Sequence, residues 1–332
     1  LKLRMEMSEE YGLDLRSRSD AQIAEAVINS ELQKVLGFYP RKPTLSADLV
    51  LQYNAPDFIS YRSQQLRDMF EVVKGARFYL DGLGSPIMPD EIDELKVKIG
   101  SSVYKLGMGG LHSTEKKTAH KATDEIILAD NDVESFYPRI ILNQRLFPSH
   151  LGEAFLQVYN SIVETRIHAK NEAAKAKKAG DKAGAKRWKT IADSLKITIN
   201  GSFGKLGNKY STLYAPQLML QVTITGQLVL LMLIEMLEDA GISVISGNTD
   251  GIVSKYHKDR HNDVRAIIAE WEKRTNFKTE ETRYSAVYSR DVNSYVAVKT
   301  ESGDAEARFL DERLGVKTKG AYCERGSALN SI

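Results

Sequence analysis

The sequence predicts an α+β fold in which antiparallel strands are backed by helices, and three observations predict it. Residues 151–179 and 185–200 are rich in helix-forming Ala, Lys and Glu and are joined by a short polar turn, which indicates an α-helical hairpin. Residues 213–239 form a long apolar stretch of helical length. The short apolar runs 242–245 and 252–256 lie on either side of a turn, as in a β-hairpin.

The first 100 residues are predicted to mix helices and loops. Apolar side chains recur at helical spacing after Asp20, which indicates an N-capped helix, and residues 63–73 indicate a second helix. Three prolines interrupt the stretch between these two helices. A strand is expected at 97–104, and it leads into the glycine-rich segment 105–112.

The later elements follow from short apolar runs. Residues 126–129 fit a buried strand that ends in acidic residues, and a helix is expected at 138–145. After the β-hairpin, an amphipathic helix is expected at 263–275, with strands at 287–299 and 307–319.

Composition places the chain among ordinary globular proteins. Of its 332 residues 42% are hydrophobic and 27% are charged. The single cysteine, Cys323, excludes an internal disulfide and a cysteine-rich zinc site. The apolar stretch Leu218–Met236 is interrupted by polar side chains, so we interpret it as a buried helix and expect no membrane partner. Because the chain starts at Leu1, we expect a fragment or a processed product. We also expect a cytoplasmic location, in the host cell cytoplasm if the protein is viral.

Charge is distributed unevenly along the chain. The net charge is only +2, which argues against a uniformly basic surface for nucleic acid. Residues 151–205, however, contain eleven Lys or Arg and five Asp or Glu, a net of +6. A basic helical hairpin is most often a solvated surface, but a local concentration of cations also suits the binding of phosphate groups.

Two aspartates stand where a metal-dependent phosphoryl transfer would need them. Such a reaction requires metal ions that neutralise phosphates, and Mg²⁺ prefers carboxylate oxygens. Asp132 follows the buried strand, and Asp250 occupies the turn of the β-hairpin. Each of them alone would also fit an ordinary acid at a strand end or in a turn. A calcium loop that starts at Asp130 is rejected, because Ser135 and Ile141 stand where it requires Gly and Glu.

A cationic helix accompanies these acids. Spacings of four, seven and eight residues put Lys196, Asn200, Phe203 and Gly204 on one helix face. A cation, an amide, an aromatic ring and bare backbone suit a triphosphate, a sugar and a base. Arg166 and Lys170 share a face of the partner helix in the same way.

Three segments resemble the motifs of family B DNA polymerases. The segment 132–141, DVESFYPRII, resembles motif A, 196–204, KITINGSFG, resembles motif B, and 246–251, SGNTDG, resembles motif C. Their order and spacing agree with the family, and the resemblance covers roughly residues 100 to 320. Met108-Gly109-Gly110 resembles a segment that precedes the palm in phage enzymes, so a phage-like member is expected.

The resemblance implies a division of the chain into parts. Residues 1–100 would precede the palm, 101–150 would form its first part, and 151–205 would form the fingers. Residues 206–332 would form the second part of the palm, with the thumb absent or truncated. The parent chain would carry an exonuclease domain upstream and a thumb downstream.

The resemblance also implies roles for the residues of the three motifs. Asp132 and Asp250, with the backbone carbonyl of Val133, would bind two Mg²⁺ ions, for which Mn²⁺ could substitute. Tyr137 would be a steric gate against the ribose 2′-hydroxyl. Arg166, Lys170 and Lys196 would bind the phosphates, and Asn200 and Phe203 would pack against the incoming nucleotide. Lys196 would also protonate the departing pyrophosphate.

Other positions would contact the DNA, and some depart from the family pattern. The expected DNA-binding residues are Gly109, Gly110, Thr223, Gly226, Tyr295, Lys317 and Lys319. Asn248 stands where motif C usually has Asp, Gly251 stands where it has Ser, and Gln227 replaces an arginine of a template-contact motif. Lys317 or Lys319 would replace the lysines that the family has before a tyrosine such as Tyr295.

The function implied by the resemblance is template-directed DNA synthesis. Deoxynucleoside triphosphates would be added to the 3′-hydroxyl of a primer-template, with release of pyrophosphate. The alternative is a catalytically weak or inactive module that binds primer-template or nucleotide, which Asn248 and Gln227 favour. An RNA-synthesising relative is disfavoured by Tyr137.

Overall fold

The computed structural model describes residues 2–46, 48–300 and 315–320 and divides into two compact units. Unit 1 comprises Leu1–Leu51, Arg77–Ile87 and Ile140–Val222, and unit 2 comprises Gln52–Ala76, Met88–Arg139 and Thr223–Ile332. The basic segment 151–205 therefore falls within unit 1, whereas Asp132 and Asp250 both belong to unit 2. Two helices, α5 (Phe136–Asn143) and α8 (Pro216–Asp239), run from one unit into the other.

Unit 2 is built on an antiparallel sheet whose described strands follow the order β1-β2-β3-β6-β7-β5-β8-β9-β10, with β4 paired to β8. The strand order places β5 between β7 and β8, so it hydrogen-bonds to a neighbour on both sides. The strands are β1 (Val97–Ile99), β2 (Ser102–Lys105), β3 (His112–Ser113), β4 (Lys116–Lys121), β5 (Ile126–Val133), β6 (Ser243–Asn248), β7 (Gly251–His257), β8 (Thr279–Asp291), β9 (Ser294–Lys299) and β10 (Val316–Lys319).

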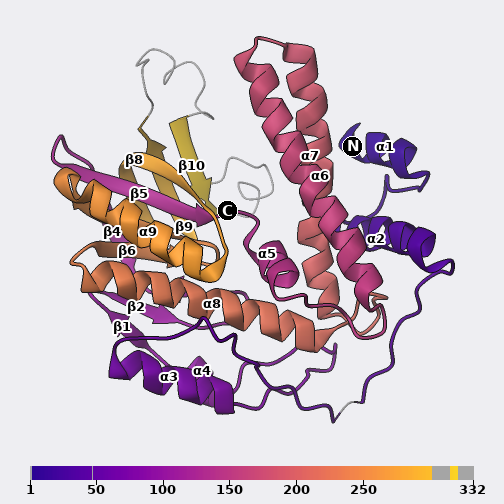
Figure 1. The fold of residues 1–332 in the computed structure, drawn as a ribbon, viewed down its shortest axis with the longest axis horizontal. Coiled ribbons are helices and arrows are strands. Elements are labelled where there is room, and N and C mark those ends of the chain that lie inside the picture. Colours follow the sequence, from indigo (N-terminus) through magenta and orange to yellow (C-terminus); the bar gives the residue numbers. More distant parts are fainter. Residues whose placement is uncertain (1, 47, 301–314, 321–332) are drawn as a thin grey trace. The chain divides into compact units, whose positions relative to one another are not determined.

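Helices back this sheet. The unit 2 part of α8 and α9 (His261–Thr275) cover one face of it (Figure 1). The buried indole of Trp271 on α9 donates a hydrogen bond to the carbonyl of Val229 on α8 at 3.0 Å. The hydroxyl of Tyr61 also reaches α8, at the carbonyl of Leu228. The smaller elements of unit 2 are α3 (Gln64–Gly75), α4 (Asp90–Asp93) and the 3₁₀ turn Lys258–Arg260.

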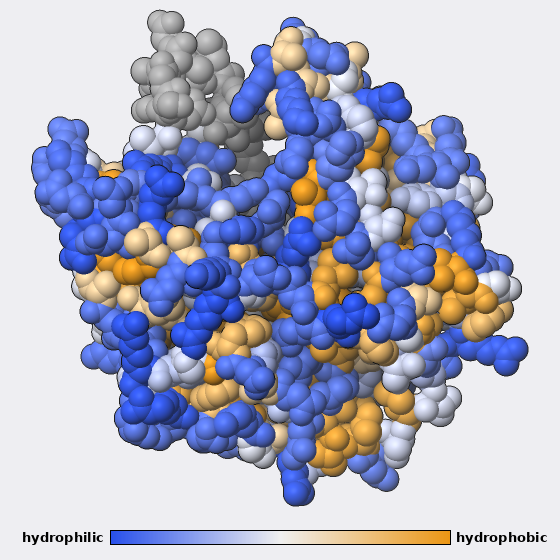
Figure 2. Space-filling view, in the orientation of Figure 1, coloured by the Kyte–Doolittle hydropathy of each residue, from blue (hydrophilic) through white to orange (hydrophobic). Residues whose placement is uncertain are grey.

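Unit 1 is helical. The helices α6 (Glu153–Lys178) and α7 (Lys182–Leu206) form an antiparallel hairpin, whose turn is closed when Asp181 accepts a hydrogen bond from the Gly184 amide. In the space-filling view the end of the hairpin that carries the α6–α7 turn is covered mainly by hydrophilic side chains (Figure 2). The helices α1 (Lys2–Tyr11) and α2 (Asp20–Leu36) complete the unit, and α2 packs on α7.

Close packing between α2 and α7 depends on a glycine. A Cβ atom added at Gly201 would lie 2.6 Å from the carbonyl oxygen of Asp20 and 2.9 Å from Cβ of Ala24. Gly204, one turn later on the same helix, has no neighbour within 4 Å. The backbone of α2 therefore lies close to α7 at Gly201 but not at Gly204.

The predicted α+β class is confirmed, and so is the helical hairpin, while several element boundaries differ. Helix α2 is capped by Ser19, not Asp20, because the Ser19 hydroxyl accepts from the Gln22 amide. The strand expected at 97–104 is a hairpin of β1 and β2 that turns at Gly100, which has φ +57°. Likewise 287–299 is split between β8 and β9, because the chain turns between Asp291 and Ser294.

Two further differences concern the acids and the C-terminal strand. The strand expected at 126–129 continues to Val133, because β7 and β8 pair with it along that length. Of the strand expected at 307–319, residues 316–319 form β10, and 307–314 lie outside the described residues. Helix α8 is long and apolar enough to cross a membrane, but 89% of its most apolar window is buried, as in a core helix.

Candidate functional site

The β6–β7 hairpin of unit 2 positions Asp250. Its strands pair up to Asn248 and Gly251, which leaves Thr249 and Asp250 in the turn. Thr249 adopts a left-handed φ of 55°, and its amide donates to the carbonyl of Leu111 at 2.8 Å. The turn is therefore tied to the end of the glycine-rich segment, and Asp250 is held by backbone contacts rather than by its own side chain.

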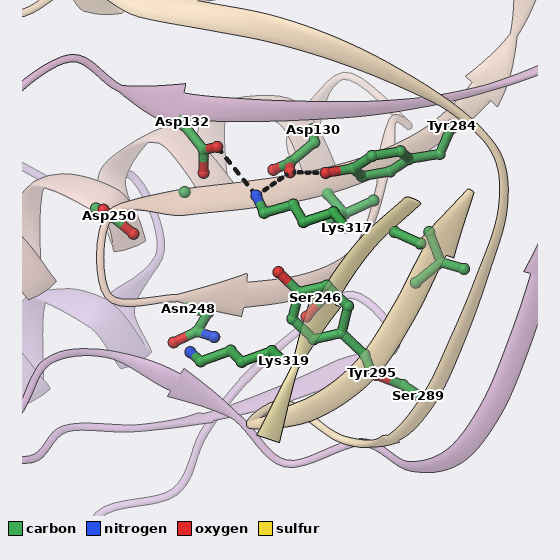
Figure 3. A pocket seen from close by; sticks show the side chains of 14 residues that line it. Asp130, Asp132, Ser246, Asn248, Asp250, Tyr284, Ser289, Tyr295, Lys317 and Lys319 are labelled. Carbon is green, nitrogen blue, oxygen red and sulfur yellow. Dashed lines mark hydrogen bonds and ion pairs between the residues drawn. The ribbon is translucent and has the colours of Figure 1, made fainter. Parts of the chain in front are cut away.

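The neighbouring strand β5 positions Asp130 and Asp132. Residues two apart on a strand face the same side, so both carboxylates point into one cavity, where Asp250 also lies (Figure 3). Asp132 pairs in register with Gly251 on β7 and with Glu280 on β8. The amide of Val133 donates to the carbonyl of Asp250 at 2.7 Å. The segments that resemble motifs A and C are thereby joined through the backbone.

Gly251 makes room for the Asp132 carboxylate. A Cβ atom added at Gly251 would lie 2.2 Å from Oδ1 of Asp132. Any larger residue, including the serine of the family pattern, would require this carboxylate to adopt another position. The sequence departure at Gly251 therefore has a physical consequence for Asp132.

A lysine from β10 bridges two of the acids. Nζ of Lys317 lies 2.9 Å from Oδ2 of Asp130 and 3.1 Å from Oδ2 of Asp132. The hydroxyl of Tyr284 donates to the same oxygen of Asp130. Asp130 is only 4% exposed, so its charge is compensated by these two partners instead of by water.

Two more predicted residues line the same cavity of about 320 Å³. Tyr295 on β9 pairs in register with Lys319 on β10, and Lys317 pairs with Ala297. Because the spacing along each strand is two, these side chains share the face on which the aspartates lie. The structure thus brings together Asp132, Asp250, Tyr295, Lys317 and Lys319, all of which were predicted from the sequence.

Burial, with repulsion from Asp130, raises the pKa of Asp132 and of Asp250. Burial is the main cause that raises the pKa of Asp132 to about 6, with a further rise from Asp130 and an opposing effect of Lys317. The Asp250 side chain reaches solvent, yet the surrounding protein buries its carboxylate enough to raise the pKa. Burial lowers the pKa of Lys317, but the two carboxylates outweigh it and the net pKa is raised.

The donor set fits a hard divalent cation. Asp132 and Asp250 supply carboxylate oxygens, and burial raises the pKa of both, so a cation beside them would favour their ionised form. Lys317 already demonstrates that a cation is stabilised beside Asp132. In the described part of the chain no three His, Cys, Asp or Glu side chains gather closely enough to hold a metal by themselves. Such a site would therefore need oxygens from a bound phosphate, as is usual for Mg²⁺.

Asn248, where motif C usually has Asp, is used as a hydrogen-bond donor. Its Nδ2 donates to the carbonyl of Val292 at 3.0 Å, and its Oδ1 accepts from the Thr249 hydroxyl at 3.0 Å. A carboxylate could not make the first of these bonds. The amide therefore connects the β6–β7 turn to the β8–β9 turn.

The glycine-rich segment packs against the same hairpin turn. A Cβ atom added at Gly110 would lie 2.9 Å from the Thr249 side chain, so glycine permits this approach. The carbonyl of Gly109 accepts a hydrogen bond from the hydroxyl of Tyr137 at 3.4 Å. Burial raises the pKa of Tyr137, with a further rise from Asp250. The predicted sugar gate thus lies within electrostatic reach of a predicted metal ligand.

The expected template-contact segment on α8 is buried. Thr223 is fully buried and Gly226 is buried, so their placement gives the prediction of DNA contact no support. Gln227 is also fully buried, and its Oε1 accepts from the Gly107 amide at 2.8 Å. Gln227 therefore connects the glycine-rich segment to α8. Its amide oxygen can accept this hydrogen bond without placing a charge in the protein interior.

Five of the seven predicted nucleotide-binding residues belong to unit 1, on α6 and α7, whereas Val133 and Tyr137 belong to unit 2. On α7 the side chains of Lys196 and Asn200 are exposed and that of Phe203 is partly exposed, whereas Leu195 and Ile199 are buried. The face predicted from spacing is thus the solvent face of the helix. Lys196 has no ion-pair partner among the described residues, while Lys189 on the same helix is paired with Asp193. On α6 Lys170 is exposed and Arg166 is partly exposed.

The sequence analysis assigned no role to Asp130 and Tyr284, which line the cavity and bond to each other. Asp130 could have been found, because the alternation of Asp130 and Asp132 on a strand puts both on one face. Tyr284 could not, because nothing near it in sequence marks a residue that bonds to an acid 154 positions away. Lys317, predicted to contact DNA, is engaged by the acids, and its DNA role stays a prediction.

Comparison with known proteins supports the fold. No protein-family model and no curated protein matches the sequence. A solved structure does match: the family B DNA polymerase from the hyperthermophilic archaeon Pyrobaculum calidifontis, with a TM-score of 0.52 and 16% identity. The fold of this chain is similar to that of a part of this polymerase. The match covers 96% of this chain and 35% of the archaeal chain, so the present chain spans about a third of that polymerase.

Proposed function

We propose that the chain is the palm and fingers core of a template-directed DNA polymerase. The observation that carries the proposal is the cavity in which β5 and the β6–β7 hairpin bring Asp132 and Asp250 together, on a family B polymerase fold. The two acids come from the segments that resemble motifs A and C. Phage-like membership of the family is part of the proposal and rests on the Met108-Gly109-Gly110 segment.

Asp132 and Asp250 would hold two Mg²⁺ ions, with Mn²⁺ as a substitute. When bound, such ions neutralise the phosphates and align the attack of the primer hydroxyl. Lys317 supplies a fixed positive charge beside Asp132 and keeps this carboxylate oriented toward the cavity. Tyr137, whose hydroxyl is tethered to Gly109, would occupy the space that a ribose 2′-hydroxyl needs.

Unit 1 would supply the cations for the triphosphate. Lys196 extends into solvent without an ion-pair partner among the described residues, so its ammonium can bind phosphate without breaking an existing contact. Asn200 and Phe203 on the same exposed face would contact the nucleotide, together with Arg166 and Lys170 of α6. The substrates would be deoxynucleoside triphosphates and primer-template DNA, in the cytoplasm, with exonuclease and thumb domains on the parent chain.

A primer-extension assay tests the proposal. The full 332-residue chain is given a labelled primer-template with Mg²⁺ and then Mn²⁺, and is compared with Asp250→Ala. Asp124→Ala, which removes an exposed acid in the turn before β5, serves as the matched control. We expect extension by the wild type and the control and none by Asp250→Ala. Equal extension by all three would refute the role of Asp250.

A second candidate is a binding module without useful turnover. Asn248 favours it, because its amide is used to fasten two turns and contributes no negative charge to the cavity. In this case the wild type would retain primer-template in EDTA and extend it with neither metal. Extension by the wild type that Asp250→Ala abolishes would exclude this candidate.

A further inference from the structure

One buried carboxylate beside the proposed metal ligands has no task in the reaction described above. Asp130 lies two residues before Asp132 on β5 and lines the same cavity (Figure 3). Its Oδ2 accepts a hydrogen bond from the Tyr284 hydroxyl and lies 2.9 Å from Nζ of Lys317. A buried carboxylate is costly unless such partners accompany it. Asp130 therefore depends on Lys317 for the compensation of its charge.

The two carboxylate contacts of Lys317 differ in their surroundings. Its Nζ lies 3.1 Å from Oδ2 of Asp132, whose side chain is 44% exposed, whereas the side chain of Asp130 is only 5% exposed. Water can solvate the Asp132 carboxylate when the ammonium leaves it, but water has little access to Asp130. The contact of Lys317 with Asp132 is therefore the easier of the two to break.

The two oxygens of Asp132 have different neighbours. A Cβ atom added at Gly251 would lie 2.2 Å from Oδ1, so this oxygen rests against the backbone of β7. The other oxygen, Oδ2, accepts a hydrogen bond from Lys317. A divalent cation with Oδ2 as a ligand would lie close to the ammonium, and the two positive charges would repel each other. Lys317 and such a cation therefore compete for Asp132.

The position of Lys317 in the sheet allows its ammonium to move. Strand β10 is the last strand in the order of the described sheet, and among the described residues it pairs with β9 on one side. A lysine carries its charge on a flexible four-carbon stem with three N–H donors. The ammonium can therefore turn from Asp132 toward Asp130 by side-chain rotation, without any change in the pairing of the strands.

We propose that Lys317 is an exchangeable cation of Asp132, and that Asp130 is the positioning residue that retains it. Without a divalent cation Lys317 bridges the two carboxylates, as in the present structure. With a divalent cation bound at Asp132, Lys317 releases this carboxylate and stays paired with Asp130. Asp130 favours the exchange because a half-buried ammonium without a counter-charge would oppose it. The inference rests on the metal site of the proposed function.

Titration of the full chain with Mn²⁺ alone, followed by electron paramagnetic resonance without nucleotide or primer, tests the competition. Lys317→Met should raise the Mn²⁺ affinity by about 10-fold, because a charge-assisted contact no longer opposes binding. Lys319→Met is the matched control, since Lys319 lines the same cavity and forms no ion pair among the described residues. It should change the affinity by less than about 3-fold. Asp132→Asn should abolish the binding, which assigns the signal to this site.

A double-mutant cycle tests the role of Asp130. Asp130→Asn should weaken Mn²⁺ binding, because Lys317 would lose its remaining carboxylate partner on release from Asp132. Lys317→Met should therefore raise the affinity by a factor about 3-fold larger in the Asp130→Asn background than in the wild type. If Asp130 acted through its charge alone, the two factors would be equal, and its role as a positioning residue would be refuted.

A second variant keeps the test decisive if Lys317→Met does not fold. Lys317→Arg keeps the charge and can bind a carboxylate through two N–H groups, so it should hold Asp132 more tightly. The Mn²⁺ affinity should then fall by about 3-fold to 10-fold. An unchanged or higher affinity in a folded Lys317→Arg variant would overturn the proposal. Equal increases for Lys317→Met and Lys319→Met would do the same, because only the total charge of the cavity would then matter.

The Mn²⁺ titration and the primer-extension assay can fail separately. Mn²⁺ binding that Lys317→Met strengthens, in a chain that extends no primer, supports the exchange and leaves only the proposed function refuted. Primer extension that Asp250→Ala abolishes, together with the same Mn²⁺ affinity in Lys317→Met and the wild type, refutes the exchange alone. Absence of any Mn²⁺ binding that depends on Asp132 would refute the exchange as well.

Discussion

The two units of this chain differ in charge and in where that charge lies. Unit 1 has 21 Lys or Arg against 14 Asp or Glu, a net of +7, and unit 2 has 25 against 30, a net of −5. In unit 1 the cations on the α7 face are exposed, whereas unit 2 directs Asp130, Asp132 and Asp250 into a cavity. The overall net charge of +2 conceals this separation.

The two units stabilise their charged side chains in different ways. Water solvates the charge of an exposed lysine or arginine. Such a side chain can therefore bind a phosphate without any rearrangement of the protein. Buried carboxylates are costly unless a cation accompanies them, and Lys317 is that cation in the present structure. A site for metal ions is thus expected in unit 2, and a site for phosphate in unit 1.

The largest effect is expected for the acids of unit 2. Asp132→Asn keeps the size of the side chain and removes its charge, so primer extension should fall by roughly 1,000-fold or more, since metal-assisted charge stabilisation is worth several kcal/mol. Steady-state incorporation of one nucleotide measures it. Asp124→Asn, on the exposed turn before β5, should extend like the wild type, and a comparable loss in that control would contradict a specific role of Asp132.

The next effect is expected for Lys196 on the exposed face of α7. Lys196→Ala should lower kcat/KM for nucleotide addition by roughly 10-fold to 100-fold, because a charge-assisted bond to phosphate is worth about 1.5–3 kcal/mol. Lys189→Ala, on the same helix, is the matched control, because the Lys189 ammonium is paired with Asp193. Mn²⁺ binding, followed by electron paramagnetic resonance, should be the same in both variants. If Lys196→Ala abolished Mn²⁺ binding, the assignment of separate tasks to the two units would fail.

A packing effect is expected at the contact of α2 and α7. Gly201→Ala should destabilise the protein by about 1–3 kcal/mol, because the added methyl group meets the backbone of Asp20. Gly204→Ala should instead stabilise it by about 0.5–1 kcal/mol, because the methyl group meets no atom within 4 Å and alanine favours the helix. Urea denaturation of both variants measures the two changes. Destabilisation of equal size at both positions would show that the close approach at Gly201 is not the cause.

The smallest effect concerns the pH dependence of stability in unit 1. Burial raises the pKa of Glu25, but the ion pair with Lys205 and the hydrogen bonds from Ser211 and Thr212 outweigh it, so the net pKa is lowered. Ionised Glu25 therefore stabilises the fold above the ordinary pKa of 4.5, and this contribution is lost as pH falls through the lowered value.

The Glu25→Gln variant isolates this contribution. We expect it to be less stable than the wild type by about 1–2 kcal/mol at pH 7, with a difference that shrinks below pH 4.5. Urea denaturation at a series of pH values measures it. Glu31→Gln is the control, because Glu31 pairs only with the exposed Lys34 among the described residues. A difference for Glu25→Gln that is constant with pH would contradict the electrostatic explanation.

Local patterns were enough to predict much of the fold. The hairpin of α6 and α7, the β6–β7 turn with Asp250 and the exposed face of Lys196 and Asn200 follow from spacing, turn residues and helix propensity. Spacing, turn residues and helix propensity are properties of short segments, so they can be seen in the sequence without knowledge of the tertiary structure. The strand boundaries were less predictable, because β5 extends through its acids only where β7 and β8 pair with it.

The local sequence was enough to predict the turns of the α6–α7 and β6–β7 hairpins and the order of the three motif-like segments. It was not enough to predict the turn at Gly100 or the turn between Asp291 and Ser294. The tertiary structure alone decided that Lys317 lies between Asp130 and Asp132, that Tyr284 bonds to Asp130, and that Gln227 is fully buried. The physical reason is the separation along the chain: Lys317 lies 187 residues after Asp130, and no local propensity acts over that distance. Only the pairing of strands in the sheet brings such groups within bonding range.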